Sequence, residues 1–201
     1  KFDEAVSYHS RLVEALSRSS ALHEGNRPEP INAPRYDTAS STPVAYDRKQ
    51  CLEFAIGKVA RVLGADFAPV DSYRTRVRLP AEPLMLVDRI VSVEGIKGSL
   101  TSGHLVTEHD VLTGAWYLDG DRAPVCIAVE AGQADLFLCS YLGIDLAVKG
   151  ERVYRLLDAS VVFHRELPRP GDTIRYEIKI EKFIRQGQTV LFFFNFEGSI
   201  N

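Results

Sequence analysis

The longest run of apolar positions in this chain lies near its middle, from Pro124 to Gly143, and reads PVCIAVEAGQADLFLCSYLG. Its apolar residues recur at spacings of three and four and spread beyond one face, which predicts a buried helix over Cys126–Leu142. Two polar residues, Glu130 and Gln133, lie inside it. A buried carboxyl group is costly unless it is paired, hydrogen-bonded or protonated. Glu130 is therefore the first candidate for chemistry.

The segment that precedes this run divides into a leader and a second helix. Helical spacing of apolar residues predicts an amphipathic helix over residues 2–18, and a polar stretch interrupted by prolines predicts an extended linker over residues 23–43. A further helix is predicted over Arg48–Leu63, with Asp47 as its N-cap and Gly64 as its stop.

The remaining apolar stretches read as strands. One begins at Leu84 and ends at Glu94-Gly95, and a second covers residues 98–108. Three more are predicted after the central helix, separated by the turn sequences LPRPGD and RQGQ, and they cover residues 151–164, 172–183 and 188–199. Within the last of them, VLFFFNF is so apolar that we expect both of its faces to be covered.

This order of elements predicts an α+β fold, an antiparallel sheet wrapped around one long central helix. We expect that domain to cover residues 46–201. A leader helix and proline-rich linker, residues 1–45, would precede it as an N-terminal extension, as in a piece of a larger protein.

Composition excludes several classes of function. The 201 residues are 45% hydrophobic and 25% charged with a net charge of −3, so neither nucleic acid nor an anionic membrane surface is an expected partner. Charged and polar residues interrupt the central run, which therefore does not predict a membrane span. Three cysteines without CxxC spacing indicate neither a zinc site nor a disulfide framework. A cytoplasmic location fits this cysteine usage.

Other polar residues have competing interpretations. Arg74, Arg76 and Arg78 alternate and would share one strand face, either as a solvated edge or as a contact for phosphate or an acidic carrier domain. Asp135 is predicted to be a solvated or capping residue. The histidines are predicted to be structural or exposed, with His109 as a minor candidate for a catalytic base.

Three passages resemble the 3-hydroxyacyl-acyl-carrier-protein dehydratases, which have the hot-dog fold. They are PLMLVDRIVSVEG, PVCIAVEAGQ and FHRELPRPGDTIRYEIKI. The resemblance is closest to the first hot dog in the dehydratase region of polyunsaturated fatty acid synthases, and it covers about residues 46–201. It implies a substrate carried on the phosphopantetheine arm of acyl carrier protein, with no metal or redox cofactor.

The resemblance also implies a pair of catalytic groups, of which this chain carries one. In the family a His takes the C2 proton and an Asp or Glu on the central helix protonates the departing hydroxyl. Glu130 stands at the acid position and Gln133 follows it by three residues, where relatives usually have four. The family's His position, fourteen residues before the acid, holds Trp116. Pro124-Val125 stands where the family has Pro-Gly.

Glu130 and Gln133 are therefore the predicted catalytic residues, and Trp116, Tyr117, Pro124 and Val125 are the predicted substrate-binding or wall-forming residues. One hypothesis is a dehydratase domain, or half of a double hot dog, that forms a trans-2-enoyl thioester. Its base would come from a second hot dog in the parent chain or from a homodimer mate. The alternative is a non-catalytic hot dog that supports a catalytic one or docks neighbouring domains, and a thioesterase is a weaker third reading.

Overall fold

The computed structural model describes residues 44–201. The chain divides into two units, residues 1–37 and residues 38–201, and the fold below is that of the second. The predicted leader helix (residues 2–18) and linker (residues 23–43) lie outside the described residues.

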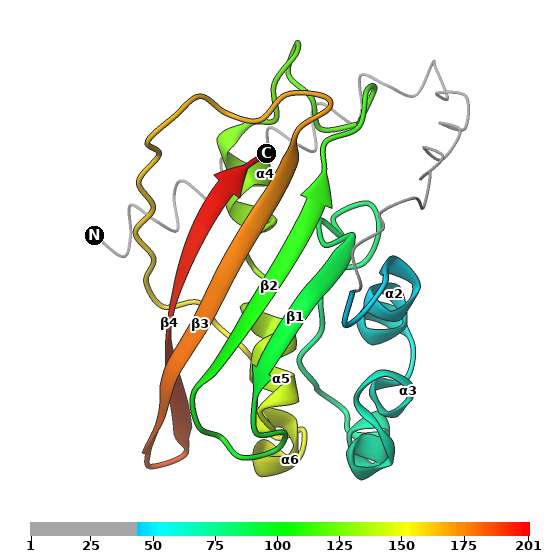
Figure 1. The fold of residues 1–201 in the computed structure, drawn as a ribbon. Helices are drawn as coiled ribbons and strands as arrows, with labels where there is room; N and C mark the ends of the chain where they lie inside the picture. The colour runs from blue at the N-terminus through cyan, green and yellow to red at the C-terminus, as the bar shows by residue number, and fades with distance from the viewer. Residues whose placement is uncertain (1–43) are drawn as a thin grey trace, which may run out of the picture. The chain divides into compact units, whose positions relative to one another are not determined.

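An antiparallel sheet of four strands forms the framework, in the order β1-β2-β3-β4 (Figure 1). The strands are β1 (Arg89–Gly95), β2 (Gly103–Asp110), β3 (Thr173–Gln186) and β4 (Thr189–Ile200). One face of the sheet is covered by α4 (Val125–Glu130), α5 (Asp135–Tyr141) and α6 (Ile144–Val148). The α+β class with an antiparallel sheet is confirmed.

Alternate residues of β3 form the floor of the core. Ile174, Tyr176, Ile178 and Ile180 are buried, whereas the residues between them are exposed or only partly buried. This period of two is that of a strand with one covered face. From the helix side, Phe137 of α5 completes the core, with its ring centroid 4.7 Å from that of Phe54.

The first three corrections to the strand predictions concern where the strands form. β1 ends at Gly95 as predicted but begins only at Arg89, because residues 84–88 form a loop, of which residues 85–88 are buried and Leu84 is 44% exposed. β2 begins at Gly103, after a turn in which the Leu100 N–H donates to the Leu142 carbonyl instead of a ladder partner. Residues 151–164 form no strand, because no backbone hydrogen bond within the described residues joins them to a neighbouring strand.

The predicted continuous central helix is also wrong, because it breaks between α4 and α5. The Tyr176 hydroxyl donates to the carbonyl of Ala128, which the Gly132 N–H would use in a regular helix. The Gly132 N–H donates instead to Val129. A Cβ at Gly132 would lie 3.3 Å from the Tyr176 ring, so glycine permits this close approach of the helix to the sheet.

The second predicted helix divides in the same way. It consists of α2 (Arg48–Ile56) and α3 (Val59–Leu63), and the short 3₁₀ helix η1 (Ala65–Ser72) follows. Asp47 caps α2 as predicted, in a capping box with Gln50. The break occurs at Gly57, where the next N-terminus is capped by Asp71, whose carboxylate accepts from the Val59 N–H at 2.7 Å.

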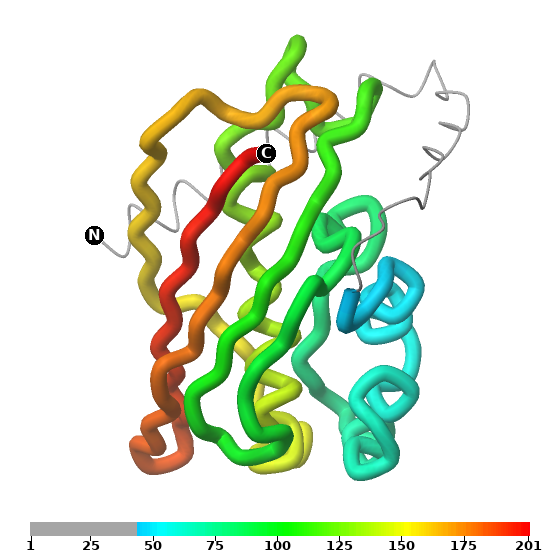
Figure 2. Tube along the Cα trace, viewed as in Figure 1, coloured from blue at the N-terminus to red at the C-terminus, as the bar shows by residue number. Residues whose placement is uncertain are grey.

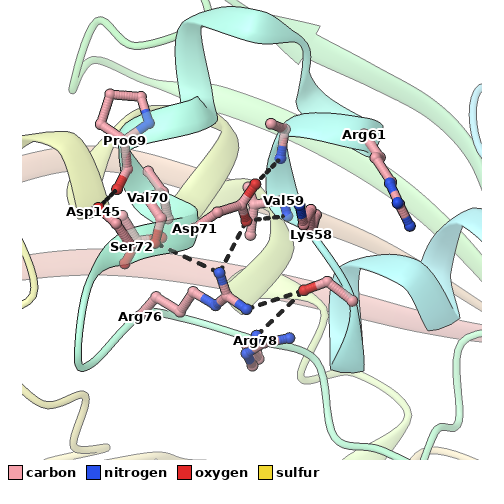
Figure 3. A network of polar contacts seen from close by, with 12 residues as sticks. Lys58, Val59, Arg61, Pro69, Val70, Asp71, Ser72, Arg76, Arg78 and Asp145 are labelled. Atoms are coloured by element: carbon pink, nitrogen blue, oxygen red, sulfur yellow. Dashed lines mark hydrogen bonds and ion pairs between the residues drawn. The ribbon is translucent and has the colours of Figure 1, made fainter.

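Two of the three alternating arginines, Arg76 and Arg78, donate hydrogen bonds at this helix break and do not lie on an exposed strand edge (Figure 3). The Arg76 guanidinium donates to Asp71 Oδ1 at 2.9 Å and to the Gly57 carbonyl at 3.0 Å, and Arg78 donates to the Ala55 carbonyl at 2.6 Å. Cations are favourable at the carbonyl end of a helix. The solvated-edge prediction for Arg76 and Arg78 is therefore wrong.

The last correction concerns β4. Its apolar run does not have both faces covered, since Phe193 is 46% exposed while Phe192, Phe194 and Phe196 pack partly against the core. β4 is one of the two edge strands of the sheet. Residues 151–168 pass beside that edge without joining it (Figure 2).

Candidate acid site on the central helix

Glu130 is the last residue of α4 and stands at the break between the two helices. Its side chain is half-buried, and Oε2 accepts a hydrogen bond of 2.9 Å from the Gln133 amide. Burial raises the pKa of Glu130 above its ordinary value. The two predicted catalytic residues therefore lie together, and the carboxyl group is partly accessible and inclined to hold a proton.

Asp135, at the start of α5, contradicts the prediction of a solvated residue. It is 1% exposed, and Oδ2 lies 3.4 Å from the Tyr154 hydroxyl, which donates to it. Burial raises the pKa of Asp135 to about 7, and the charge of Glu130 contributes to the increase. Apolar neighbours on both sides, Ala134 and Leu136, were the available sequence signal for this burial.

Tyr117, a predicted substrate-binding residue, lies in a buried polar chain. Its hydroxyl lies 2.8 Å from His109 Nε2, and His109 Nδ1 lies 2.8 Å from Asp88 Oδ2. Tyr117, His109 and Asp88 are all nearly inaccessible to solvent. These three hydrogen-bonded side chains hold the loop before α4 against the start of the sheet. The sequence did not reveal this positioning role.

Trp116, which was also predicted to bind substrate or to form a wall of the site, does not lie in the protein interior. Its side chain is 50% exposed, and its indole N–H donates to the Pro83 carbonyl at 3.1 Å. The position that the resemblance assigned to the missing base is thus on the surface of the described unit. Contact of Trp116 or Tyr117 with substrate stays a prediction.

Pro124 and Val125 begin α4. Pro124 is the N-cap residue, and its carbonyl accepts from the N–H groups of Ile127 and Ala128. Val125 is 49% exposed. The loop is held in front of the helix by the Ala123 N–H, which donates to the Pro168 carbonyl at 2.8 Å. These contacts orient α4, and substrate contact by either residue stays a prediction.

Within residues 44–201, no hydrogen bond or ion pair joins a histidine to Glu130. His109 is engaged with Asp88 and Tyr117, and His104 lies 3.9 Å from Glu177. His164 lines a cavity of about 650 Å³ beside β4 that does not include Glu130. The described residues thus present an acid with its amide partner, without a base in contact.

Neither a metal centre nor a membrane span emerges from residues 44–201. That part of the chain brings together no group of three His, Cys, Asp or Glu side chains that could hold a metal ion. None of its helices is long and apolar enough to cross a membrane. Cys51, Cys126 and Cys139 are free thiols.

Comparison with known proteins identifies the family. The region that matches contains the sheet and Glu130. Residues 79–201 match the FabA-like domain. This chain belongs to the FabA-like domain family. The match confirms the hot-dog fold, and it begins ahead of β1 and includes Glu130, Gln133 and the segment beside β4.

A curated relative extends the similarity of this FabA-like domain. The chain is 36% identical over 167 residues to one of the subunits of a polyunsaturated fatty acid synthase from Thraustochytrium sp.. The alignment covers 82% of this chain and 11% of the relative, so the chain spans about a tenth of that protein's length. The resemblance to polyunsaturated fatty acid synthases is thereby confirmed.

Proposed function

We propose that this FabA-like domain supplies the acid of a 3-hydroxyacyl-acyl-carrier-protein dehydratase, which forms a trans-2-enoyl thioester in polyunsaturated fatty acid or polyketide-like synthesis. The observation that carries the proposal is the state of Glu130. Its carboxyl group is half-buried, bonded to Gln133 and raised in pKa by burial. A carboxylic acid must hold its proton near neutral pH to donate it.

The proposed reaction removes a proton from C2 and a hydroxyl group from C3. A base takes the C2 proton, and the electron pair of that bond forms the C2–C3 double bond. The C3–O bond breaks as the hydroxyl takes the proton of Glu130 and leaves as water. Gln133 orients the Glu130 carboxyl group through its amide. This chemistry requires no metal or redox cofactor, and the substrate arrives on the phosphopantetheine arm of acyl carrier protein.

The base comes from outside the described residues in this proposal, since Trp116 stands at the family's His position. A second hot dog of the same synthase, or a homodimer mate, would provide the His for a shared site. Glu130 remains partly exposed, which allows a second protomer or domain to reach it. We propose a cytoplasmic setting for this assembly, in keeping with the free cysteines.

The decisive test is Glu130→Gln in an assembly that includes the domain supplying the base. Turnover of a 3-hydroxyacyl thioester on acyl carrier protein should fall by a factor on the order of 10²–10⁴, the usual contribution of a general acid. Glu94→Gln, at an exposed glutamate near the end of β1, serves as the matched control and should leave turnover unchanged. Wild-type turnover by Glu130→Gln would remove Glu130 from the mechanism.

A second candidate function is a non-catalytic hot dog that supports a catalytic partner. It is favoured by the lack of a histidine in contact with Glu130 within residues 44–201. The same experiment separates the two functions. In a supporting domain, Glu130→Gln would leave turnover intact, whereas substitutions that unfold this domain would still abolish it.

A further inference from the structure

The ring of Tyr176 in β3 is enclosed between α4 and β4. Its side chain is 6% exposed. A glycine lies against the ring on each side: a Cβ at Gly132 would come within 3.3 Å of it, and a Cβ at Gly198, the pairing partner in β4, would come within 2.7 Å. Phe196 contacts the ring edge-on, with the two centroids 5.6 Å apart. The ring therefore has a closely fitted place that directs its hydroxyl at the backbone of α4.

That hydroxyl changes the hydrogen bonding of the backbone around the acid. Tyr176 donates to the Ala128 carbonyl, which is the acceptor that the Gly132 N–H would have in a regular α-helix. The Gly132 N–H donates instead to the carbonyl three residues before it, at 3.0 Å. The Gln133 N–H does the same with the Glu130 carbonyl, also at 3.0 Å. Two successive bonds thus span three residues instead of four, which is the pattern of a 3₁₀ turn.

This turn suits the spacing of the acid and its amide partner. Side chains three residues apart are eclipsed in a 3₁₀ turn, whereas they are offset by about 60° around an α-helix. Glu130 and Gln133 are three residues apart, and the Gln133 amide donates to Glu130 Oε2 at 2.9 Å. The backbone geometry that accompanies the Tyr176 bond is therefore the one that brings these two side chains into line.

We propose that Tyr176 is a positioning residue for the acid: its hydroxyl holds residues 129–133 in a 3₁₀ turn, and the turn aligns the Gln133 amide with the Glu130 carboxyl group. Tyr176 acts through the backbone of α4 and not by contact with substrate. Its effect on catalysis rests on the proposed dehydratase function. The alignment of Gln133 with Glu130 is a property of the fold and can be tested without turnover.

Nuclear magnetic resonance of the side-chain amide gives the direct test. In the wild-type chain, one Gln133 amide proton should resonate downfield of the usual glutamine range, because it donates to a carboxylate. Tyr176→Phe keeps the ring and removes the hydroxyl, so the Gly132 N–H can return to the Ala128 carbonyl and the resonance should move into the usual range. Its absence in Gln133→Ala assigns the signal. An ordinary wild-type resonance, or a shifted one that persists in Tyr176→Phe, would overturn the proposal.

Two further variants separate this effect from a general loss of structure. Tyr141→Phe is the matched control, since the Tyr141 hydroxyl also donates to a backbone carbonyl, that of Gly95, at 3.5 Å. It should leave the Gln133 resonance in place. Gly198→Ala keeps the Tyr176 hydroxyl but places a methyl group against the ring, so it should move the resonance as Tyr176→Phe does. Circular dichroism checks that each variant is folded. A shifted resonance that persists in folded Gly198→Ala would also contradict the proposal.

Turnover then distinguishes this inference from the proposed function. In the assembly that includes the domain supplying the base, Tyr176→Phe should lower kcat about fivefold with KM unchanged, as expected for loss of one hydrogen bond. Tyr176→Phe combined with Gln133→Ala should lose no more than either alone, because both remove the same contact. Losses that multiply to about 25-fold would refute action through Gln133. Wild-type turnover by Glu130→Gln would refute the proposed function instead, and the amide resonance would still decide the alignment.

Discussion

α4 and α5 come from one apolar stretch of the sequence, yet their carboxyl groups differ in burial and in hydrogen-bond partner. Glu130 at the end of α4 is half-buried and accepts a hydrogen bond from the Gln133 amide, whereas Asp135 at the start of α5 is 1% exposed and bonded to Tyr154. Burial raises the pKa of both. A raised pKa alone therefore does not identify a catalytic acid, because a substrate must also reach the group.

A break in the helix separates the two carboxyl groups. Tyr176 takes the Ala128 carbonyl and Gly132 lies against the Tyr176 ring, so the chain turns tightly between the two carboxyl groups. α5 then packs its residues 135–140 into the core, while α4 keeps several residues accessible.

Phe137→Ala should produce the largest loss of stability among these variants and should show that α5 belongs to the hydrophobic core. The ring is completely buried and contacts Phe54 and Tyr46, so its removal should lower the free energy of unfolding by about 3–5 kcal/mol. Val125→Ala, at a half-exposed position of α4, is the control and should cost much less. Urea unfolding followed by circular dichroism measures both. Equal losses would contradict the distinction between the two helices.

Asp135→Asn should change how stability depends on pH. The folded-state pKa of about 7 lies above the unfolded value of 3.8, so the folded protein holds this proton more tightly between those pH values. Its contribution to stability is fully present below about pH 4 and is lost as pH rises through 7, a difference on the order of a few kcal/mol.

The asparagine variant keeps an oxygen that accepts from Tyr154 but cannot ionise. Thermal melts across this pH range should therefore show a decline in wild type that is reduced in Asp135→Asn. Asp158→Asn, at an exposed aspartate, provides the control and should retain the wild-type profile. An unchanged profile in Asp135→Asn would mean that Asp135 is already ionised in the folded protein.

Gln133→Ala should have the smallest effect on stability and a selective effect on activity. Gln133 is only partly buried, so stability should change by no more than about 0.5 kcal/mol. Loss of the amide donor should lower turnover about fivefold, since one hydrogen bond contributes roughly 1 kcal/mol. Gln133→Glu retains size but not the donor, and should fall at least as far. Full activity in Gln133→Ala would exclude the orienting role.

The sequence by itself determined the α+β class, the family and the identity of the acid candidate. Three of the features used are local patterns: the alternation in β3, the capping signal at Asp47 and the apolar run around Glu130. A local pattern can be recognised in the sequence wherever its spacing matches the period of the helix or strand. The Trp at the family's His position is likewise legible in the sequence alone.

Only the tertiary structure determined where the helices and strands predicted from those patterns end. The break of the central helix depends on a hydroxyl of β3, far away in sequence, and the burial of Asp135 depends on Tyr154 and the core around α5. Residues 151–164 have strand composition, but a strand exists only where a partner supplies the other half of its hydrogen bonds. Long-range contacts of this kind leave no trace in local periodicity, which is why the open edge of the sheet appeared only in the fold.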